Sequence, residues 1–208
     1  MKLYYVPGAC SLAPHIALQE LGLPHSLVKV NGRTKESEEG DYVKINPKGS
    51  VPALRTDDGQ LLTEVAVILQ YLADRKPEAK LLPAIESGWD RYRAQEWLNY
   101  VATDIHKSLG LLFSAERFVP NAESRATYRE TILKTLFGRL AWIDSQLATR
   151  ETLLPSGFSV ADIYLFTVLN WAKPLQVDLG EFRHLGRALE KTRGRASTQN
   201  ALKAEGLL

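Results

Sequence analysis

The stretch "KLYYVPGACSLAPHIALQELG", residues 2–22, decides the fold of the first part of the chain. Its opening residues are rich in Tyr and Val and run into Pro7-Gly8, which is typical of a buried strand ended by a turn. A helix is predicted next, with Ser11 as its N-cap, Pro14 in its first turn and Gly22 at its end. The stretch therefore predicts a strand followed directly by a helix.

The residues that follow extend this unit into an α/β domain. "SLVKV", residues 26–30, alternates like a second strand, and the handedness of strand-helix-strand units makes it parallel to the first. Asp58-Gly59 separates the short runs 51–55 and 60–62, which predicts a hairpin. Residues 64–75 then show one apolar helical face. The predicted order is βαβ, a polar connection, and ββα.

A second, all-helical part is predicted after the two prolines of "KPEAKLLPA". No strand-like alternation recurs there, so we place the domain boundary near residue 80, with an α/β domain over 1–80 and a helical domain over 87–208. Apolar spacing predicts one or two helices over 87–116 and another over 125–148.

The stretch "FSVADIYLFTVLNWA", residues 158–172, is apolar on nearly all sides and predicts a buried central helix. Ser159 and, three residues later, Asp162 have the spacing of a capping box. We expect this pair to be structural.

Composition excludes several classes of protein. Twenty-six basic and 24 acidic residues give a net charge of +2, which argues against nucleic acid, and we interpret Lys191, Arg193 and Arg195 as a solvated helix end because no aromatic residues are interleaved with them. The longest aliphatic run, 65–69, is too short for a bilayer span, and no export signal is visible. One cysteine cannot form an internal disulfide, so we expect a cytoplasmic protein without membrane partners.

That cysteine, Cys10, lies just before the first predicted helix. Unpaired amides and the helix dipole at such a place lower the pKa of a thiol from its usual ~8.5 and give a nucleophile. The alternative is a small buried hydrophobic residue, and position alone does not decide between the two. No second cysteine follows two residues later, so disulfide chemistry would need an external thiol.

Three polar residues, Asn99, Thr103 and His106, follow one another at spacings of four and three, which puts them on one face of a helix. His106 could act there as an acid, a base or a hydrogen-bond donor. The same stripe could simply face solvent. The remaining histidines have no ligand-like spacing and no phosphate-binding loop is present, so we expect neither a metal nor a nucleotide cofactor.

Five stretches together, "YYVPGACSLAPH", "NPKGSVPAL", "LLTEVAVILQYLAD", "EWLNYVATDIHKSL" and "FSVADIYLFTVLNWA", resemble the bacterial beta-class glutathione transferases over the whole chain. The resemblance implies a thioredoxin-like N-terminal domain in the order βαβ-α-ββα and an all-α helical-bundle C-terminal domain that carries the second-substrate site and dimer contacts. It also implies detoxification, a homodimer, and glutathione as co-substrate with no resident cofactor.

The resemblance further assigns the site. Cys10 and His106 would be catalytic, with His106 close to the glutathione sulfur, and a cis peptide at Val51-Pro52 would pair with the ligand backbone. Further glutathione contacts would come from Tyr5, Lys35, Glu64, Val65, Asn99, Thr103 and Asp104.

Each of these contacts has an expected role or an alternative. Glu64 would bind the ligand ammonium and the Val65 N–H its γ-glutamyl carboxylate, although Glu64 could instead be a helix-dipole partner. Many relatives have Ser or Thr where this chain has Val65, so one hydroxyl hydrogen bond is missing. Lys35 would pair with the glycyl carboxylate or be solvated, and Tyr5 would face the cleft or pack in the core. Asp104 would reach the ligand of the partner subunit.

The predicted activity is conjugation of the glutathione thiolate to electrophilic, largely apolar small molecules. Two alternatives remain at this stage. Cys10 could support glutathione-dependent thiol-disulfide or peroxide reduction, or the fold could serve as a non-catalytic carrier of hydrophobic ligands.

Overall fold

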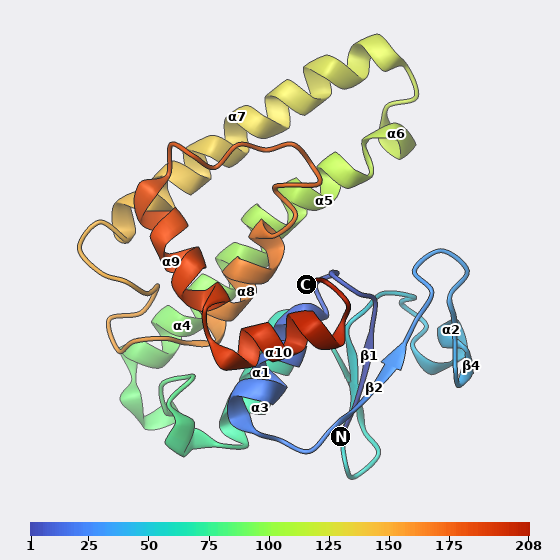
Figure 1. The fold of residues 1–208 in the computed structure, drawn as a ribbon, viewed down its shortest axis with the longest axis vertical. Coiled ribbons are helices and arrows are strands. Elements are labelled where there is room, and N and C mark those ends of the chain that lie inside the picture. Colours follow the sequence, from blue (N-terminus) through green and yellow to red (C-terminus); the bar gives the residue numbers. More distant parts are fainter.

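The computed structural model describes residues 1–208, in which an α/β part packs against a larger helical part (Figure 1). The order of the α/β part confirms the predicted βαβ-α-ββα. The small β3–β4 hairpin was predicted only as a polar connection, because two-residue strands carry no readable period. The elements of this part are β1 (Lys2–Tyr5), α1 (Leu12–Leu21), β2 (Ser26–Lys29), β3 (Glu36–Ser37), β4 (Gly40–Asp41), α2 (Tyr42–Ile45), β5 (Ala53–Arg55), β6 (Leu61–Thr63) and α3 (Val65–Asp74).

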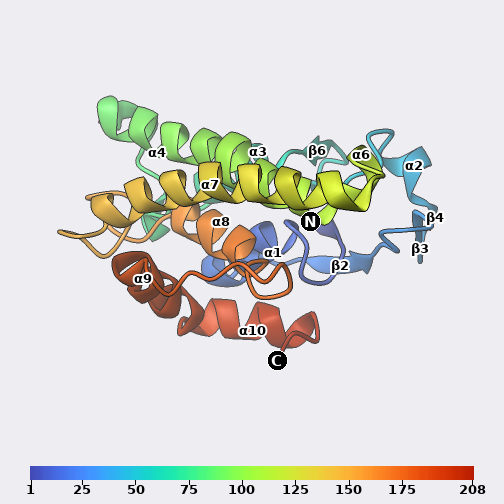
Figure 2. The ribbon, with the colours of Figure 1, turned by 90° about the horizontal axis from the view of Figure 1, so that it is seen from above.

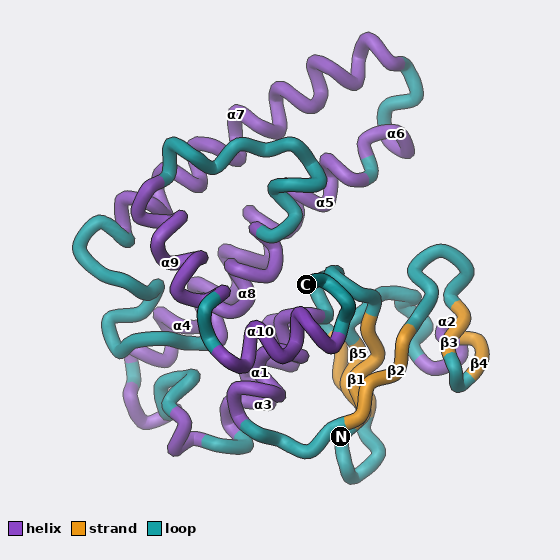
Figure 3. The backbone as a smooth tube through the Cα atoms, viewed as in Figure 1, coloured by secondary structure: helices purple, strands orange, loops and turns teal.

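The four longer strands form one mixed sheet in the order β2-β1-β5-β6. Strand β1 is parallel to β2, with Leu3 opposite Leu27, as the handedness rule predicts. Strands β5 and β6 are antiparallel across the Asp58-Gly59 turn, which confirms the predicted hairpin. Figure 3 shows α1 and α3 together on one side of these strands.

The second part contains helices only. Its elements are η1 (Pro77–Ala79), η2 (Ile85–Ser87), α4 (Trp89–Tyr100), η3 (Val101–His106), α5 (Lys107–Phe113), α6 (Ala115–Phe118), α7 (Ala122–Gln146), α8 (Val160–Leu169), α9 (Arg183–Arg193) and α10 (Ala196–Ala204). The stretch predicted as one or two helices over 87–116 is α4 and α5 joined through η3, a π-helical segment. The exact domain limits of 1–80 and 87–208 stay a prediction.

One apolar core runs through both parts of the molecule. All ten residues of α8 are buried, as predicted for a central helix. Seen from above, α1 and α8 form a middle layer, with α4 and α7 on one side and α9 and α10 on the other (Figure 2). Helix α10 packs on α1, so the C-terminus of the chain lies against the helix that follows Cys10.

The capping box at the start of α8 is confirmed. The Asp162 carboxylate accepts hydrogen bonds from the Ser159 N–H at 2.9 Å and hydroxyl at 2.8 Å, and from the Leu153 N–H at 2.8 Å. Burial raises the pKa of Asp162 to about 6, against the opposing effect of these donors. The carboxylate thus ties the preceding loop to the central helix.

Replacement of this carboxylate should destabilise the fold. Asp162→Ala leaves buried donors of Ser159 and Leu153 without acceptors, so we expect a loss of about 2–4 kcal/mol in the free energy of unfolding, measured in urea. Asn121→Ala, which removes the exposed N-cap of α7, is the control and should cost about 1 kcal/mol. Equal losses in the two variants would contradict this structural role.

Candidate active site

The loop between β1 and α1 carries the only cysteine. Gly8 has φ +71°, a conformation that glycine adopts without steric cost, and the turn at Pro7-Gly8 is as predicted. Ser11 is the N-cap residue of α1, as predicted, but its side chain makes no capping bond. Its hydroxyl instead donates to the Val6 C=O and accepts from the Val6 N–H, both at 3.1 Å, because the loop folds back within its reach.

Gly8 is held on both sides by residues near the C-terminus. Its N–H donates to Glu205 at 2.8 Å, and its C=O accepts from the Trp171 indole at 2.7 Å. The second oxygen of Glu205 lies 2.8 Å from His15 Nδ1 in α1, in a buried pair. Sequence reasoning missed these contacts, because no local pattern signals a bond between residues 197 apart.

The Cys10 thiol donates to the Val51 C=O at 3.2 Å. Burial raises its pKa to about 12, although the Cys10 and Ser11 amides oppose the rise; the charge of Glu64 adds to it. The lowered pKa predicted from the helix N-terminus is therefore wrong. Loss of hydration around the sulfur outweighs the partial charges of two amides, and Cys10 is a neutral thiol near pH 7.

The Val51-Pro52 peptide bond is cis, as the resemblance implied. The Val51 C=O faces the Cys10 thiol, while the Val51 N–H has no acceptor within the chain. A backbone N–H left free at a half-buried position is ready to pair with an extended peptide ligand.

A second set of free amides lies at the start of α3. The N–H groups of Val65 and Ala66 have no acceptor in the chain, as expected for the first turn of a helix. Glu64, just before them, has φ +71°, and its carboxylate accepts from Lys48 at 2.6 Å. Lys48 was not among the predicted residues. Only its place beside the Val51-Pro52 turn could have suggested it.

His106 ends η3 and lies against the central helix. Its Nδ1 is 2.7 Å from the Tyr164 hydroxyl. Burial and, to a lesser extent, the charge of Lys107 lower its pKa to about 4, so the imidazole is neutral at physiological pH. We assign the donor role to Tyr164, because its buried O–H has no other acceptor. The proton of His106 then lies on Nε2, which can donate.

An aromatic surface adjoins His106. The Trp171 ring is 5.0 Å from the imidazole and 5.7 Å from the Phe113 ring, both edge to face. Phe113 is exposed and Trp171 half-buried, so the surface is open to an apolar partner. Trp171 and Tyr164 were also missed as site residues, because both belong to the apolar stretch that predicts a core helix.

The remaining predicted residues are placed as follows. Asn99 and Thr103 are exposed, and Asp104 pairs with Arg139 at 2.7 Å within this chain. Thr103 and His106 lie in the π-helical segment, where the period of 3.6 residues behind the predicted stripe does not hold.

Tyr5 and Lys35 complete the set. Tyr5 packs in the core with its ring centroid 6.4 Å from that of His15, which agrees with the packing alternative. Lys35 is half-buried, has φ +64° and makes no ion pair.

Electrostatics connects the central residues. Burial raises the pKa of Tyr164, and the carboxylate of Glu64 raises it further. The same carboxylate raises the pKa of Cys10, and it raises the pKa of His106 against the larger effect of burial. The thiol loop, the start of α3 and the end of η3 therefore face one region. It combines free backbone donors, a neutral thiol and an imidazole N–H.

Comparison with known proteins shows the family to which the chain belongs. Family models of the glutathione S-transferase N-terminal and C-terminal domains match residues 8–75 and 125–191. The chain is 42% identical over 208 residues to glutathione S-transferase GstA of Escherichia coli O157:H7, with 100% of each chain covered. The chain belongs to the glutathione S-transferase family.

Solved structures support the same assignment. A bacterial beta-class glutathione S-transferase of Sphingomonas chungbukensis and a sphingomonad glutathione S-transferase complexed with glutathione each match with a TM-score of 0.90 and 40% identity, and 100% of both chains is covered. The thioredoxin-like domain, the helical domain and the bacterial beta-class resemblance are confirmed. No helix of this transferase combines the length and hydrophobicity that a membrane span requires.

The raised pKa makes Cys10 a slow nucleophile in the free transferase. Its alkylation by iodoacetamide, followed by mass spectrometry, should accelerate about tenfold per pH unit between pH 7 and 10 without a plateau. Free cysteine, the control, should level off above its pKa of ~8.5. A plateau below pH 8 would show that the thiolate forms readily after all.

Proposed function

We propose that this glutathione transferase binds glutathione beside Cys10 and adds its thiolate to electrophilic, largely apolar small molecules. The observation that carries the proposal is the set of unused donors around one thiol. These donors are the N–H of Val51, the N–H groups of Val65 and Ala66, and Nε2 of His106. A peptide-like anion with a reactive sulfur matches this set.

Each part of glutathione has a partner in the proposal. The Val51 N–H pairs with the ligand backbone, and the α3 amides bind the γ-glutamyl carboxylate at the positive end of the helix dipole. Glu64 takes the ammonium, and Lys48 beside it holds the Glu64 carboxylate in place. Further contacts are proposed from Tyr5, Lys35, Asn99, Thr103 and Asp104.

In the proposed reaction the nucleophile is the sulfur of glutathione, and not that of Cys10. The glutathione thiol loses its proton to solvent, and the resulting thiolate accepts a hydrogen bond from His106 Nε2. The thiolate then forms a carbon–sulfur bond with the electrophile, from which a leaving group such as halide departs. Because His106 is neutral, it acts as a donor rather than as an acid.

Cys10 has a supporting role in this scheme. A thiol with a pKa of about 12 keeps its proton near pH 7 and can donate to sulfur or carbonyl oxygen, but it attacks slowly. This property favours conjugation over the redox alternative. The second substrate lies on the aromatic surface of Trp171 and Phe113, which suits an apolar electrophile.

Two parts of the proposal concern assembly and location. A homodimer is supported by the exposed aromatic side chains of Trp89 and Tyr92 on α4, which a partner subunit would cover. A cytoplasmic location is supported by the single unpaired cysteine. Sedimentation of the purified protein and fractionation of cells test these two parts.

Steady-state kinetics tests the activity. With glutathione and 1-chloro-2,4-dinitrobenzene, His106→Ala should lower kcat/KM about a hundredfold, because a donor to the developing charge is lost. Cys10→Ala should stay within about threefold of the parent in conjugation and lose disulfide exchange. A screen of aryl halides, epoxides, peroxides and mixed disulfides defines the substrate class. Absence of turnover with every aryl halide and epoxide would reject the proposal.

A substitution of Val65, the residue after Glu64, tests the proposed position of glutathione independently of the kinetic measurements. Val65→Thr adds a hydroxyl beside the free amide, so calorimetric titration should give a Kd for glutathione about fivefold lower. Val67→Thr, an exposed position on the same helix, is the matched control and should leave the Kd unchanged. An equal Kd for all three proteins would argue against a carboxylate at the start of α3.

A further inference from the structure

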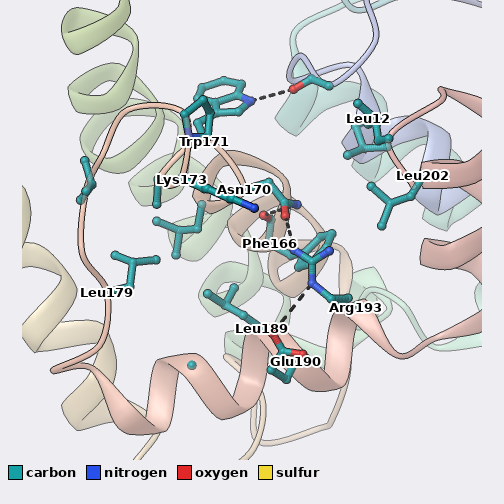
Figure 4. A pocket seen from close by; sticks show the side chains of 17 residues that line it. Leu12, Phe166, Asn170, Trp171, Lys173, Leu179, Leu189, Glu190, Arg193 and Leu202 are labelled. Carbon is teal, nitrogen blue, oxygen red and sulfur yellow. Dashed lines mark hydrogen bonds and ion pairs between the residues drawn. The ribbon is translucent and has the colours of Figure 1, made fainter.

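The backbone beside the Cys10 thiol is held in place by side chains on two sides. On one side the Trp171 indole donates to the Gly8 C=O at 2.7 Å (Figure 4). On the other side lies the peptide that joins Ser50 to Val51, whose N–H is one of the free donors of the proposed glutathione site. The side chains that direct this N–H come from α2 and from the residue that ends it.

Two side chains donate to the carbonyl of this peptide. The Tyr42 hydroxyl donates to the Ser50 C=O at 2.9 Å, and the side-chain amide of Asn46, the C-cap residue of α2, donates to the same oxygen at 2.8 Å. The Asn46 amide also donates to the Tyr42 hydroxyl oxygen at 3.3 Å, so the three groups form a closed set of hydrogen bonds. Both acceptor positions of the Ser50 carbonyl are therefore used inside the protein.

Both donors are buried. Tyr42 is 0% exposed and Asn46 is 2% exposed, although asparagine is mostly found at protein surfaces. Burial raises the pKa of Tyr42, against the opposing effect of the hydrogen bond from Asn46, so the hydroxyl keeps its proton near pH 7. A buried hydroxyl and a buried amide destabilise a fold unless they find an acceptor, and the Ser50 carbonyl is the acceptor that they share.

Peptide geometry makes this contact decide the direction of the Val51 N–H. The one cis bond of the chain lies after Val51, so the bond between Ser50 and Val51 is trans, and the C=O and N–H of a planar trans peptide point in opposite directions. Because Tyr42 and Asn46 fix the C=O on their side, the N–H is fixed on the opposite side, where it has no acceptor within the chain. Two donors on one carbonyl also polarise the peptide and strengthen its N–H as a donor.

We propose that Tyr42 and Asn46 are positioning residues for glutathione, which act through the peptide between Ser50 and Val51 and aim its N–H at the ligand backbone. The inference rests on the proposed function, in which this N–H pairs with glutathione. Both side chains lie on the carbonyl side of the peptide and do not touch the ligand. Their loss therefore weakens glutathione binding without changing the step at the sulfur.

Asn46 also supports the part of the site that binds the ligand ammonium. Its side-chain oxygen accepts from the Lys48 N–H at 3.2 Å, and the Lys48 ammonium donates to Glu64 at 2.6 Å. One side chain thus orients the peptide of Val51 with its nitrogen and the backbone of Lys48 with its oxygen. We expect Asn46 to affect glutathione affinity more than Tyr42 does.

Tyr42→Phe removes the hydroxyl and keeps the ring in the core. Tyr4→Phe is the matched control, because Tyr4 is equally buried, its ring centroid lies 5.7 Å from that of Tyr42, and its hydroxyl donates at 2.6 Å to the exposed Glu39 rather than to backbone beside Cys10. The two variants should lose similar stability toward urea. Only Tyr42→Phe should raise the Kd for glutathione, about three- to fivefold, in calorimetric titration.

Steady-state kinetics separates positioning from general damage to the site. With 1-chloro-2,4-dinitrobenzene and saturating glutathione, the kcat of Tyr42→Phe should stay within about twofold of the parent, while the KM for glutathione rises as the Kd does. Asn46→Asp keeps the size of the side chain and the oxygen that accepts from Lys48, but it places an acceptor against the Ser50 carbonyl. It should raise this KM about tenfold or more, with kcat again near that of the parent. Thermal melting followed by circular dichroism verifies that all variants are folded.

The outcomes distinguish this inference from the proposed function. An equal Kd for glutathione in the parent, Tyr42→Phe and Asn46→Asp would overturn the inference and leave the proposed function standing. Equal weakening in Tyr4→Phe and Tyr42→Phe would overturn it as well, because the effect would then come from loosened packing. A parent protein that does not bind glutathione would reject the proposed function and the inference together.

Discussion

The site depends on two hydrogen bonds that fix Gly8 in the loop before Cys10. Gly8, with φ +71°, donates its N–H to Glu205 and accepts a hydrogen bond at its C=O from Trp171. Glu205 is buried and is itself paired with His15 of α1. Because a buried carboxylate needs such partners, the C-terminal residues and the Cys10 loop keep a fixed relation. The two parts of the chain thus build one site.

Burial decides the chemistry of that site. The helix N-terminus and two amides favour a thiolate at Cys10, yet the cost of removing the charge from water is larger and raises the pKa to about 12. The same effect lowers the pKa of His106 to about 4. A neutral thiol attacks slowly, and a neutral imidazole can still donate a hydrogen bond from Nε2, which is why we propose that the reactive sulfur belongs to the ligand.

Trp171, in the helical part, contacts both the loop before Cys10 and His106. Its indole N–H donates to the Gly8 C=O, its ring packs on His106, and it lies just after α8, where it lines a cavity of about 870 Å³. One side chain therefore contacts both the thiol loop and the imidazole.

The sequence by itself determined the elements and their order. The strand-turn-helix of residues 2–22, the Asp58-Gly59 hairpin, the buried helix α8 and its capping box are all local patterns, and each is present as predicted. The cis bond at Val51-Pro52 and the family came from resemblance rather than from local physics. Local patterns could not give the π-helical segment, because one extra residue in a turn does not change an apolar period visibly.

Only the tertiary structure decided the state and the neighbours of the functional groups. The position of Ser11 as N-cap was predicted correctly, but its hydroxyl bonds to Val6 rather than to the helix. The direction of the Cys10 pKa shift was predicted wrongly, because burial outweighs the neighbouring amides. For the same reason, the sequence did not predict that the site includes Tyr164, Lys48 and Glu205. Hydration and hydrogen bonding depend on what surrounds an atom in space, and a linear pattern records only what precedes and follows it.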